Sequence, residues 1–491
     1  MNFTNMCTLV KNSRTQEGDK CQTIFEMSIK VLKHVLKCLI IKFHIIFDCM
    51  IDFIFGLYYD HNIQKVPPIK NDLLLTSASE LAERIRTKKI SSVEVVTAFI
   101  NRAKEVNGII NAIVEDRYSD ALEEAKEVDK FLQTLENIDS IKEKKPFLGV
   151  PFTTKESNEA KDMLHTMGLT SRCTFRSKED ATAISFMKNA GGILIAKTNI
   201  PELNLWTESR NNVYGQTCNP YNTTRNVGGS SGGEGAITAA CGTAFSVASD
   251  IGGSTRMPAF FNGVFGFQST AGLTPLKGIG LRKEDYPNSM AGVGPMCKKA
   301  EDLVPILKVL VGEKISLLKL DAEVDIKCLN IFYQENSGDI RASKVNSEMR
   351  AALLKVVQHF KEITGSATKI KIPGSEYSYR LWRFWMTQEN FDFKINITNG
   401  KDKLEHNGIL IYPSSPFQTG YHYTAYLRPF NFGYWGLFNV LKFPVCQVPL
   451  GVGKNGLPIG VQVVAAPYND HLCLAAAREL EKVFGGWVPP A

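Results

Sequence analysis

Apolar and polar residues repeat with different periods along the chain, and these periods predict where helices and strands lie. In residues 77–86, Leu81 and Ile85 are four apart, which is the spacing of one helix face. Ser91-Ser-Val-Glu94 has the form of a capping box and predicts a second helix through Ala103. Further helices are expected at 181–189, 348–363 and 469–484, and the stretch 294–303 is expected to form the opening of another.

Short apolar runs bounded by glycine or proline predict buried strands. They cover 192–197, 443–450 and 458–464, and Val150-Pro-Phe152 is typical of the end of another strand. Alternating helix and strand signals predict an α/β fold with a large mixed central β-sheet surrounded by α-helices. Since no low-complexity linker or internal repeat divides the later chain, residues 71–491 are expected to form a single domain.

Residues 1–70 are predicted to be an N-terminal apolar, membrane-associated segment. The stretch 27–59 is rich in Ile, Leu, Val and Phe but contains four lysines and two aspartates, whereas a clean membrane span needs about 20 mostly uncharged residues. This pattern favours a helix that lies in the membrane interface, or a weakly apolar span whose lysines reach the headgroups. An amphipathic helix packed on the domain or on another subunit is the alternative.

Composition narrows the classes of partner. Hydrophobic residues make up 44% of the chain and charged residues 22%, enough for a sizeable core. The net charge of +7 is spread along the chain without an aromatic-interleaved basic stripe, which argues against nucleic-acid binding and leaves a membrane surface as a partner. The 11 cysteines are dispersed without a Cys-x-x-Cys pair, which indicates reduced thiols facing the cytosol. No metal and no cofactor is predicted, because no Cys/His cluster has zinc spacing.

Two glycine-serine loops carry the candidate chemistry. They are Gly-Gly-Ser-Ser-Gly-Gly-Glu at Gly228–Glu234 and Asp-Ile-Gly-Gly-Ser at Asp250–Ser254. Residues 235–249 between them are almost all small or apolar, so their backbones can approach closely in a buried site. A serine directly after Ile-Gly-Gly can present its hydroxyl while nearby backbone N–H groups form an oxyanion hole. The pattern suggests acyl transfer by serine.

Such a serine needs a base. The nearest histidines in sequence, His165 and His359, lie in no context that indicates a Ser-His-Asp triad. Burial lowers the pKa of a lysine and makes it a base near neutral pH. Lys155 follows the apolar Val150-Pro-Phe and is the candidate, while Lys197 is a second buried lysine that precedes a turn at Thr198-Asn199.

Lys155 followed by these two loops resembles the amidase signature family of Ser-cisSer-Lys hydrolases, and within it the membrane-associated fatty-acid amide hydrolases. The likeness runs from about residue 73 to 487. It implies Ser254 as nucleophile, Ser230, 24 residues earlier, as bridging serine, Lys155 as base, and a cis Gly229–Ser230 peptide bond. The implied oxyanion-hole donors are the N–H groups of Ile251, Gly252, Gly253 and Ser254.

The resemblance implies hydrolysis of the amide bond of fatty-acid (N-acyl) amides through an acyl-enzyme, with a small lipid amide as substrate. It also implies a membrane protein, single-pass or monotopic through its N-terminal segment, with a cytosolic catalytic domain, and it is compatible with a homodimer. Two alternatives remain. One is the ammonia-transferring amidase subunit of an aminoacyl-tRNA amidotransferase, and the other is a catalytically impaired, membrane-bound lipid-amide binding protein.

Three departures from the family pattern bear on activity. Asp162 stands in place of a usual glycine, Gln268-Ser269 in place of Lys-Pro, and Ser249 in place of a common threonine. None removes a catalytic group, but Asp162 matters if that position needs a positive φ. The aromatic runs 377–393 and 421–438 are candidates for the walls of an acyl-chain channel, with ordinary core packing as the alternative. The region 396–406 is shorter than in fatty-acid amide hydrolases.

Overall fold

The computed structural model describes residues 3–135, 139–286, 289–387 and 407–490. The chain divides into two compact units, Met1–Phe53 and Ile54–Ala491. The described helices are α1 (Phe3–Tyr59), α2 (Ala78–Arg86), α3 (Ser92–Ile110), α4 (Tyr118–Gln133), α5 (Asp139–Lys144), α6 (Thr182–Asn189), α7 (Gly232–Ala239), α8 (Arg256–Phe261), α9 (Leu303–Val311), α10 (Ser347–Thr364), α11 (Ser378–Met386), α13 (Gly433–Leu441) and α14 (Asp470–Phe484).

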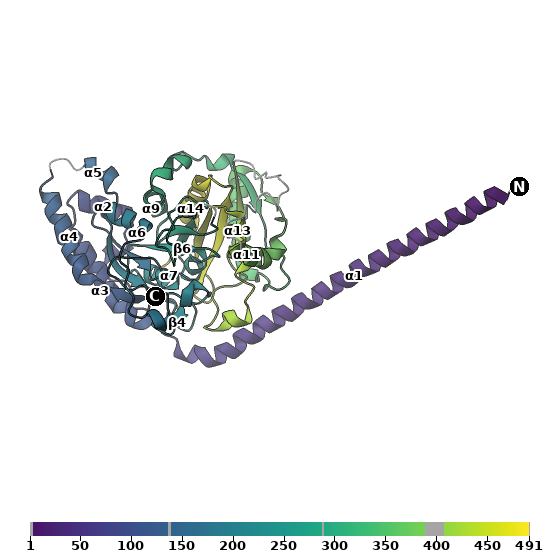
Figure 1. Ribbon diagram of the computed structural model, residues 1–491, viewed down its shortest axis with the longest axis horizontal. Coiled ribbons are helices and arrows are strands. Elements are labelled where there is room, and N and C mark those ends of the chain that lie inside the picture. The colour runs from purple at the N-terminus through teal and green to yellow at the C-terminus, as the bar shows by residue number, and fades with distance from the viewer. Residues whose placement is uncertain (1–2, 136–138, 287–288, 388–406, 491) are drawn as a thin grey trace. The chain divides into compact units, whose positions relative to one another are not determined.

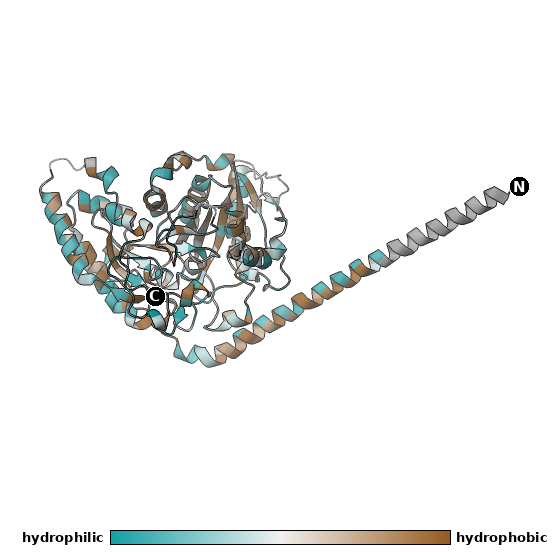
Figure 2. Ribbon diagram, viewed as in Figure 1, coloured by the Kyte–Doolittle hydropathy of each residue, from teal (hydrophilic) through white to brown (hydrophobic). Residues whose placement is uncertain are grey.

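The smaller unit, where it is described, is helical and belongs to α1. Figure 2 shows apolar and polar residues interspersed along this helix. Large apolar side chains are exposed on it, among them Leu32, Phe43 and Phe53. A search of the described residues finds no helix with both the length and the apolar character needed to cross a membrane.

The larger unit is built on one mixed β-sheet, which Figure 1 shows enclosed by helices. Eleven of the described strands form it in the order β1-β3-β2-β6-β8-β7-β12-β13-β11-β9-β10, and β4 and β5 pair separately. The strands are β1 (Ile113–Asp116), β2 (Pro151–Lys155), β3 (Ile193–Thr198), β4 (Arg210–Asn211), β5 (Gly215–Gln216), β6 (Phe245–Asp250), β7 (Phe265–Gln268), β8 (Gly292–Cys297), β9 (Asn330–Tyr333), β10 (Thr368–Lys369), β11 (Gly408–Pro413), β12 (Val445–Val452) and β13 (Pro458–Ala465).

Parallel and antiparallel pairing occur in different parts of this sheet. Strand β2 pairs in parallel with β3 and β6, and β11 and β10 each pair in parallel with β9. The strands from β6 through β8, β7, β12 and β13 to β11 pair antiparallel. The predicted mixed α/β architecture is therefore confirmed.

Local signals explain where several helices begin and end. The Ser91 side chain accepts the Glu94 N–H at 3.0 Å, which confirms Ser91 as the N-cap of α3. That helix runs to Ile110, beyond the expected end at Ala103, and Asn111 closes it in a left-handed conformation. Helix α14 ends as expected at Gly485, which also has a positive φ.

The prediction for 294–303 was wrong over its first half. Gly292–Cys297 is the buried strand β8, inserted between β6 and β7, and helix α9 begins only at Leu303. Gly294 lies so close to β7 that a Cβ there would be 1.8 Å from the Phe267 carbonyl oxygen. Helix signals within a short stretch of sequence cannot reveal such a pairing partner, because the partner is a strand elsewhere in the chain.

The main core fills the space between the sheet and its covering helices. Phe152 of β2 stacks on Phe245 of β6 with ring centroids 5.5 Å apart, and both side chains are buried. Helices α3, α9 and α14 contribute Phe99, Ile306 and Leu480 to the same cluster. This packing fixes β2 and β6, and the candidate site lies at the ends of both strands.

The close approach at Gly294 predicts a large effect on stability. We expect Gly294→Ala to destabilise the protein by about 3 kcal/mol, because the added methyl overlaps a backbone carbonyl that cannot move aside. The control is Gly108→Ala on an exposed part of α3, where no atom lies within 4 Å of the added Cβ. Helix propensity predicts that this control stabilises the protein by up to about 1 kcal/mol. Equal shifts of the thermal unfolding midpoint for both variants would contradict the packing argument.

Candidate active site

Lys155 lies at the end of strand β2, all of which is buried. Its Nζ lies 2.6 Å from Ser230 Oγ, 3.2 Å from Ser249 Oγ and 3.4 Å from the Ser249 carbonyl oxygen. Burial lowers the pKa of Lys155 to about 7, although the carboxyl groups of Asp250 and Glu234 act in the opposite direction. The structure thus brings the predicted base and bridging serine together. Ser249, which departs from the family pattern, keeps a hydroxyl beside the amine.

The serine loop, Gly228–Glu234, is held by main-chain contacts. The Gly229–Ser230 peptide bond is cis, as the resemblance implied. A Cβ on Gly229 would lie 2.4 Å from the Trp206 carbonyl oxygen, so only glycine fits there. The Ser231 N–H donates to the Ser254 carbonyl oxygen at 3.2 Å, which ties this loop to the second one.

The nucleophile turn, Ile251–Ser254, follows strand β6. Ser254 is partly exposed, whereas Ser230 and Lys155 are buried, so the predicted nucleophile is the member of the three that solvent or a substrate can reach. The Asp250 carboxylate accepts the Gly253 N–H at 2.7 Å and the Thr255 N–H at 3.0 Å. An oxyanion role for Gly253 would therefore require its N–H to be shared with Asp250.

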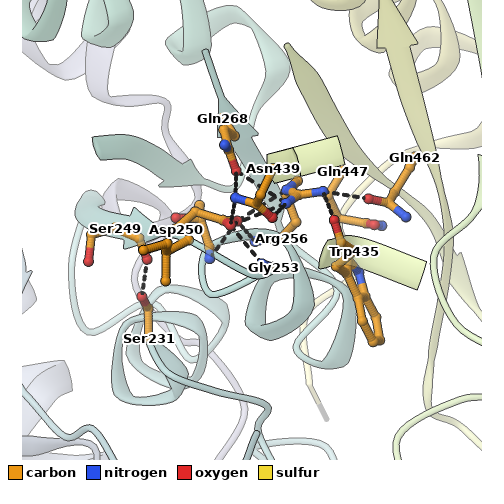
Figure 3. A network of polar contacts seen from close by, with 12 residues as sticks. Ser231, Ser249, Asp250, Gly253, Arg256, Gln268, Trp435, Asn439, Gln447 and Gln462 are labelled. Atoms are coloured by element: carbon orange, nitrogen blue, oxygen red, sulfur yellow. Dashed lines mark hydrogen bonds and ion pairs between the residues drawn. The ribbon is translucent and has the colours of Figure 1, made fainter. Parts of the chain in front are cut away.

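A buried polar network anchors this turn (Figure 3). Arg256 forms an ion pair with Asp250 and donates to the Gln268 and Asn439 side-chain oxygens at 3.1 and 2.6 Å. It also donates to the Trp435 carbonyl oxygen at 3.1 Å. Burial alone would raise the pKa of Asp250, but the Arg256 guanidinium and the hydrogen bonds hold it below its usual value. The ionised carboxylate can thus keep the turn in place.

This network gives Gln268 a structural role. Its Oε1 also accepts from Asn439 Nδ2 at 2.9 Å. Gln268, which departs from the family pattern, therefore takes part in anchoring the turn.

Asp162 adopts the conformation that favours glycine. Its φ is +64°, and its N–H donates to the Ser177 carbonyl oxygen at 2.9 Å. Aspartate is among the non-glycine residues that enter the left-handed region most readily. The backbone that a glycine would supply is therefore retained.

Lys197 faces away from the serines. In the β2–β3 register, Lys155 pairs with Thr198 and Thr154 pairs with Lys197, so Lys197 lies on the opposite face of the sheet from Lys155. Burial lowers its pKa to about 8, and its Nζ donates to the Leu164 carbonyl oxygen. It is not brought to the candidate site.

Glu234 is a neighbour of Lys155 whose role the sequence did not indicate. Its carboxyl oxygens accept the hydroxyls of Thr153 at 3.0 Å and Thr198 at 2.9 Å, and the side chain is fully buried. Burial raises its pKa to about 7, against the lowering effect of these hydrogen bonds. The sequence did contain a signal for this residue, because Glu234 is the one acidic residue in the stretch 228–249, whose other residues are small or apolar.

The described parts of the two aromatic runs border the nucleophile turn through Trp382 of α11 and Trp435 of α13. A Cβ on Gly252 would lie 2.8 Å from Trp382 Nε1, and a Cβ on Gly253 would lie 2.4 Å from Trp435 Cβ. The rest of the first run, 388–393, and the region 396–406 lie outside the described residues.

Comparison with known proteins identifies the family. The amidase family matches residues 94–406. Fatty-acid amide hydrolase 2 of Homo sapiens is 39% identical, with 86% of this chain and 92% of that protein covered. A glutamyl-tRNA(Gln) amidotransferase subunit of Methylacidiphilum infernorum is 25% identical over 84% of this chain and 95% of that protein. A solved fatty acid amide hydrolase shares the fold, with a TM-score of 0.69, 23% identity and coverage of 85% and 86% of the two chains.

The family match covers well over half of the chain, and the human relative extends the likeness to most of its length. The chain therefore belongs to the amidase signature family of amide-hydrolysing enzymes.

Proposed function

We propose that this enzyme hydrolyses the amide bond of fatty-acid (N-acyl) amides, with Ser254 as nucleophile, Ser230 as proton bridge and Lys155 as base. The observation that carries the proposal is the buried Lys155 amine, 2.6 Å from Ser230 Oγ and with a pKa lowered to about 7. The substrate class rests on the relative named fatty-acid amide hydrolase 2. The amidotransferase subunit is a more distant relative, which makes ammonia transfer the weaker alternative.

The contacts of Lys155 suit a neutral amine. Such a group has two N–H donors and one lone pair. Nζ donates to Ser230 Oγ at 2.6 Å and to Ser249 at 3.2 and 3.4 Å; once the amine is neutral, its two remaining donors can stay on Ser249 while the lone pair faces the Ser230 hydroxyl proton. A protonated lysine has no lone pair and could not accept that proton.

The reaction then proceeds in two halves. Lys155 takes the Ser230 proton while Ser230 takes that of Ser254, and Ser254 Oγ attacks the amide carbonyl carbon. Backbone N–H groups of Ile251 and Gly252 stabilise the oxyanion, with Ser254 as a further donor. The proton returns through Ser230 to the leaving amine as the C–N bond breaks, and water then hydrolyses the acyl-enzyme and restores Ser254.

Covalent labelling tests the nucleophile. We expect a fluorophosphonate probe to modify Ser254 in the full chain and Ser254→Ala to abolish the adduct, because an activated serine is the group that reacts. Hydrolysis of an N-acyl amide should fall by a factor of about 10³ or more in this variant. Ser185→Ala on α6 is the control and should label normally. A folded wild-type enzyme that takes no label would overturn the hydrolase proposal.

The pH dependence tests the base. Because the neutral form of Lys155 is the active one, kcat/KM should rise with pH through about 7 and level off above it. The Glu234 carboxylate raises the pKa of Lys155, so Glu234→Gln should move this rise to lower pH. Glu479→Gln, which removes the partner of His359, serves as a control and should leave the profile in place. If the rise in kcat/KM occurs at the same pH in Glu234→Gln as in wild type, or at a higher pH, this assignment is contradicted.

We also propose that the enzyme associates with a membrane surface through residues 27–59. Support comes from the exposed apolar side chains of α1, such as Leu39, Phe43 and Ile46, which are 58%, 64% and 68% exposed. Their spacing of four and three residues places them on one helix face. Lysines among them suit anionic headgroups.

Vesicle flotation tests this association. We expect the full chain to float with phosphatidylcholine–phosphatidylserine vesicles, and a Leu39→Glu, Phe43→Glu, Ile46→Glu variant to bind at least about tenfold more weakly, since three carboxylates would enter the interface. Leu281→Glu, at a 59% exposed leucine of the larger unit, is the control. Equal binding of both variants and wild type would exclude this face of α1.

A further inference from the structure

Trp382 of helix α11 reaches the nucleophile turn from more than a hundred residues away in sequence. Its indole Nε1–H donates to the Ile251 carbonyl oxygen at 2.8 Å. The indole also covers Gly252, since a Cβ built there would lie 2.8 Å from Nε1 and 3.1 Å from Cε2. This is a direct, side-chain hydrogen bond to the backbone of the turn that precedes Ser254.

We propose that Trp382 is a positioning residue that orients the oxyanion hole by holding the Ile251–Gly252 peptide group. In a planar trans peptide the carbonyl and the following N–H point in opposite directions. Fixing the Ile251 carbonyl on the indole therefore directs the Gly252 N–H away from Trp382. This inference rests on the proposed function, in which the Gly252 N–H receives the oxyanion.

Other contacts hold the rest of the turn in place. The Ile251–Gly252 peptide group is the part that Trp382 holds. Asp250 accepts the Gly253 N–H, and Trp435 Cβ packs over the Gly253 Cα. The Ile251–Gly252 group lies before these anchors and leads into two consecutive glycines, whose backbones rotate more freely than those of other residues. Trp382 restrains that rotation.

The indole is itself held firmly enough to act as a restraint. It meets the Phe432 ring edge to face, with centroids 4.8 Å apart and an interplanar angle of 79°. Gly436 of α13 lies against its other edge, because a Cβ there would be 3.2 Å from Trp382 Cδ1. Phe432 and Gly436, at the start of α13, thus pack against the indole that α11 carries.

The test is Trp382→Phe, which keeps an aromatic ring and removes the N–H. We expect kcat for an N-acyl amide to fall about tenfold with KM within about twofold, because the hydrogen bond orients a donor that acts in the transition state. A trifluoromethyl ketone whose adduct with Ser254 carries an oxyanion should lose affinity by a similar factor. Trp487→Phe is the matched control, since the Trp487 indole nitrogen has no partner among the described residues.

Other outcomes are equally informative. A rise in KM at unchanged kcat would assign Trp382 to the wall of the substrate site and overturn the proposal, as would wild-type values in Trp382→Phe. A lowered thermal midpoint with parallel loss of fluorophosphonate labelling would show a merely structural role. If wild type takes the fluorophosphonate label but cleaves no N-acyl amide, the substrate proposal fails while the labelling rate of Trp382→Phe still tests the oxyanion hole.

Discussion

The proposed chemistry of this enzyme depends on the burial of one amine. Lysine becomes a base near neutral pH only where the protonated form is costly, and Lys155 reaches that state because all five residues of β2 are buried within the sheet. The flanking strands β3 and β6 pair in parallel with β2, so their ends and the serine loop meet at the same edge. The central sheet thus excludes water from the Lys155 side chain.

A second buried charge has a different purpose. The Asp250–Arg256 pair is fully enclosed, and burying two ions is expensive unless their hydrogen bonds are satisfied. Here the carboxylate accepts backbone N–H groups of the nucleophile turn, and the guanidinium donates to side-chain and backbone oxygens of β7, β13 and α13. The pair therefore connects the turn to β7, which follows closely in sequence, and to α13 and β13, which are distant in sequence; this is a role in geometry rather than in net stability.

Much of this arrangement could be predicted from the sequence. The features that could be predicted depend on local sequence, and those that could not depend on tertiary contacts. The serine loop and Lys155 were visible because their requirements are local: glycine where no Cβ fits, and an apolar run before the lysine. Strand β8 was mistaken for the start of a helix, because its assignment depends on β6 and β7 on either side. Trp382 gave no signal as a partner of Ile251 for the same reason, since tertiary packing alone brings α11 to the turn.

Glu234, a neighbour of Lys155, affects the balance between the protonated and neutral forms of the amine. Burial lowers the pKa of Lys155 and raises that of Glu234, each to about 7. Moving one proton from the amine to the carboxyl leaves the net charge of the pair unchanged; it removes two charges from a buried site, and it also removes the attraction between them. Thr153 and Thr198 can follow this change because a hydroxyl both donates and accepts hydrogen bonds. Glu234 is therefore coupled to Lys155: its ionised form favours the protonated amine, and its neutral form removes that opposition to the free base.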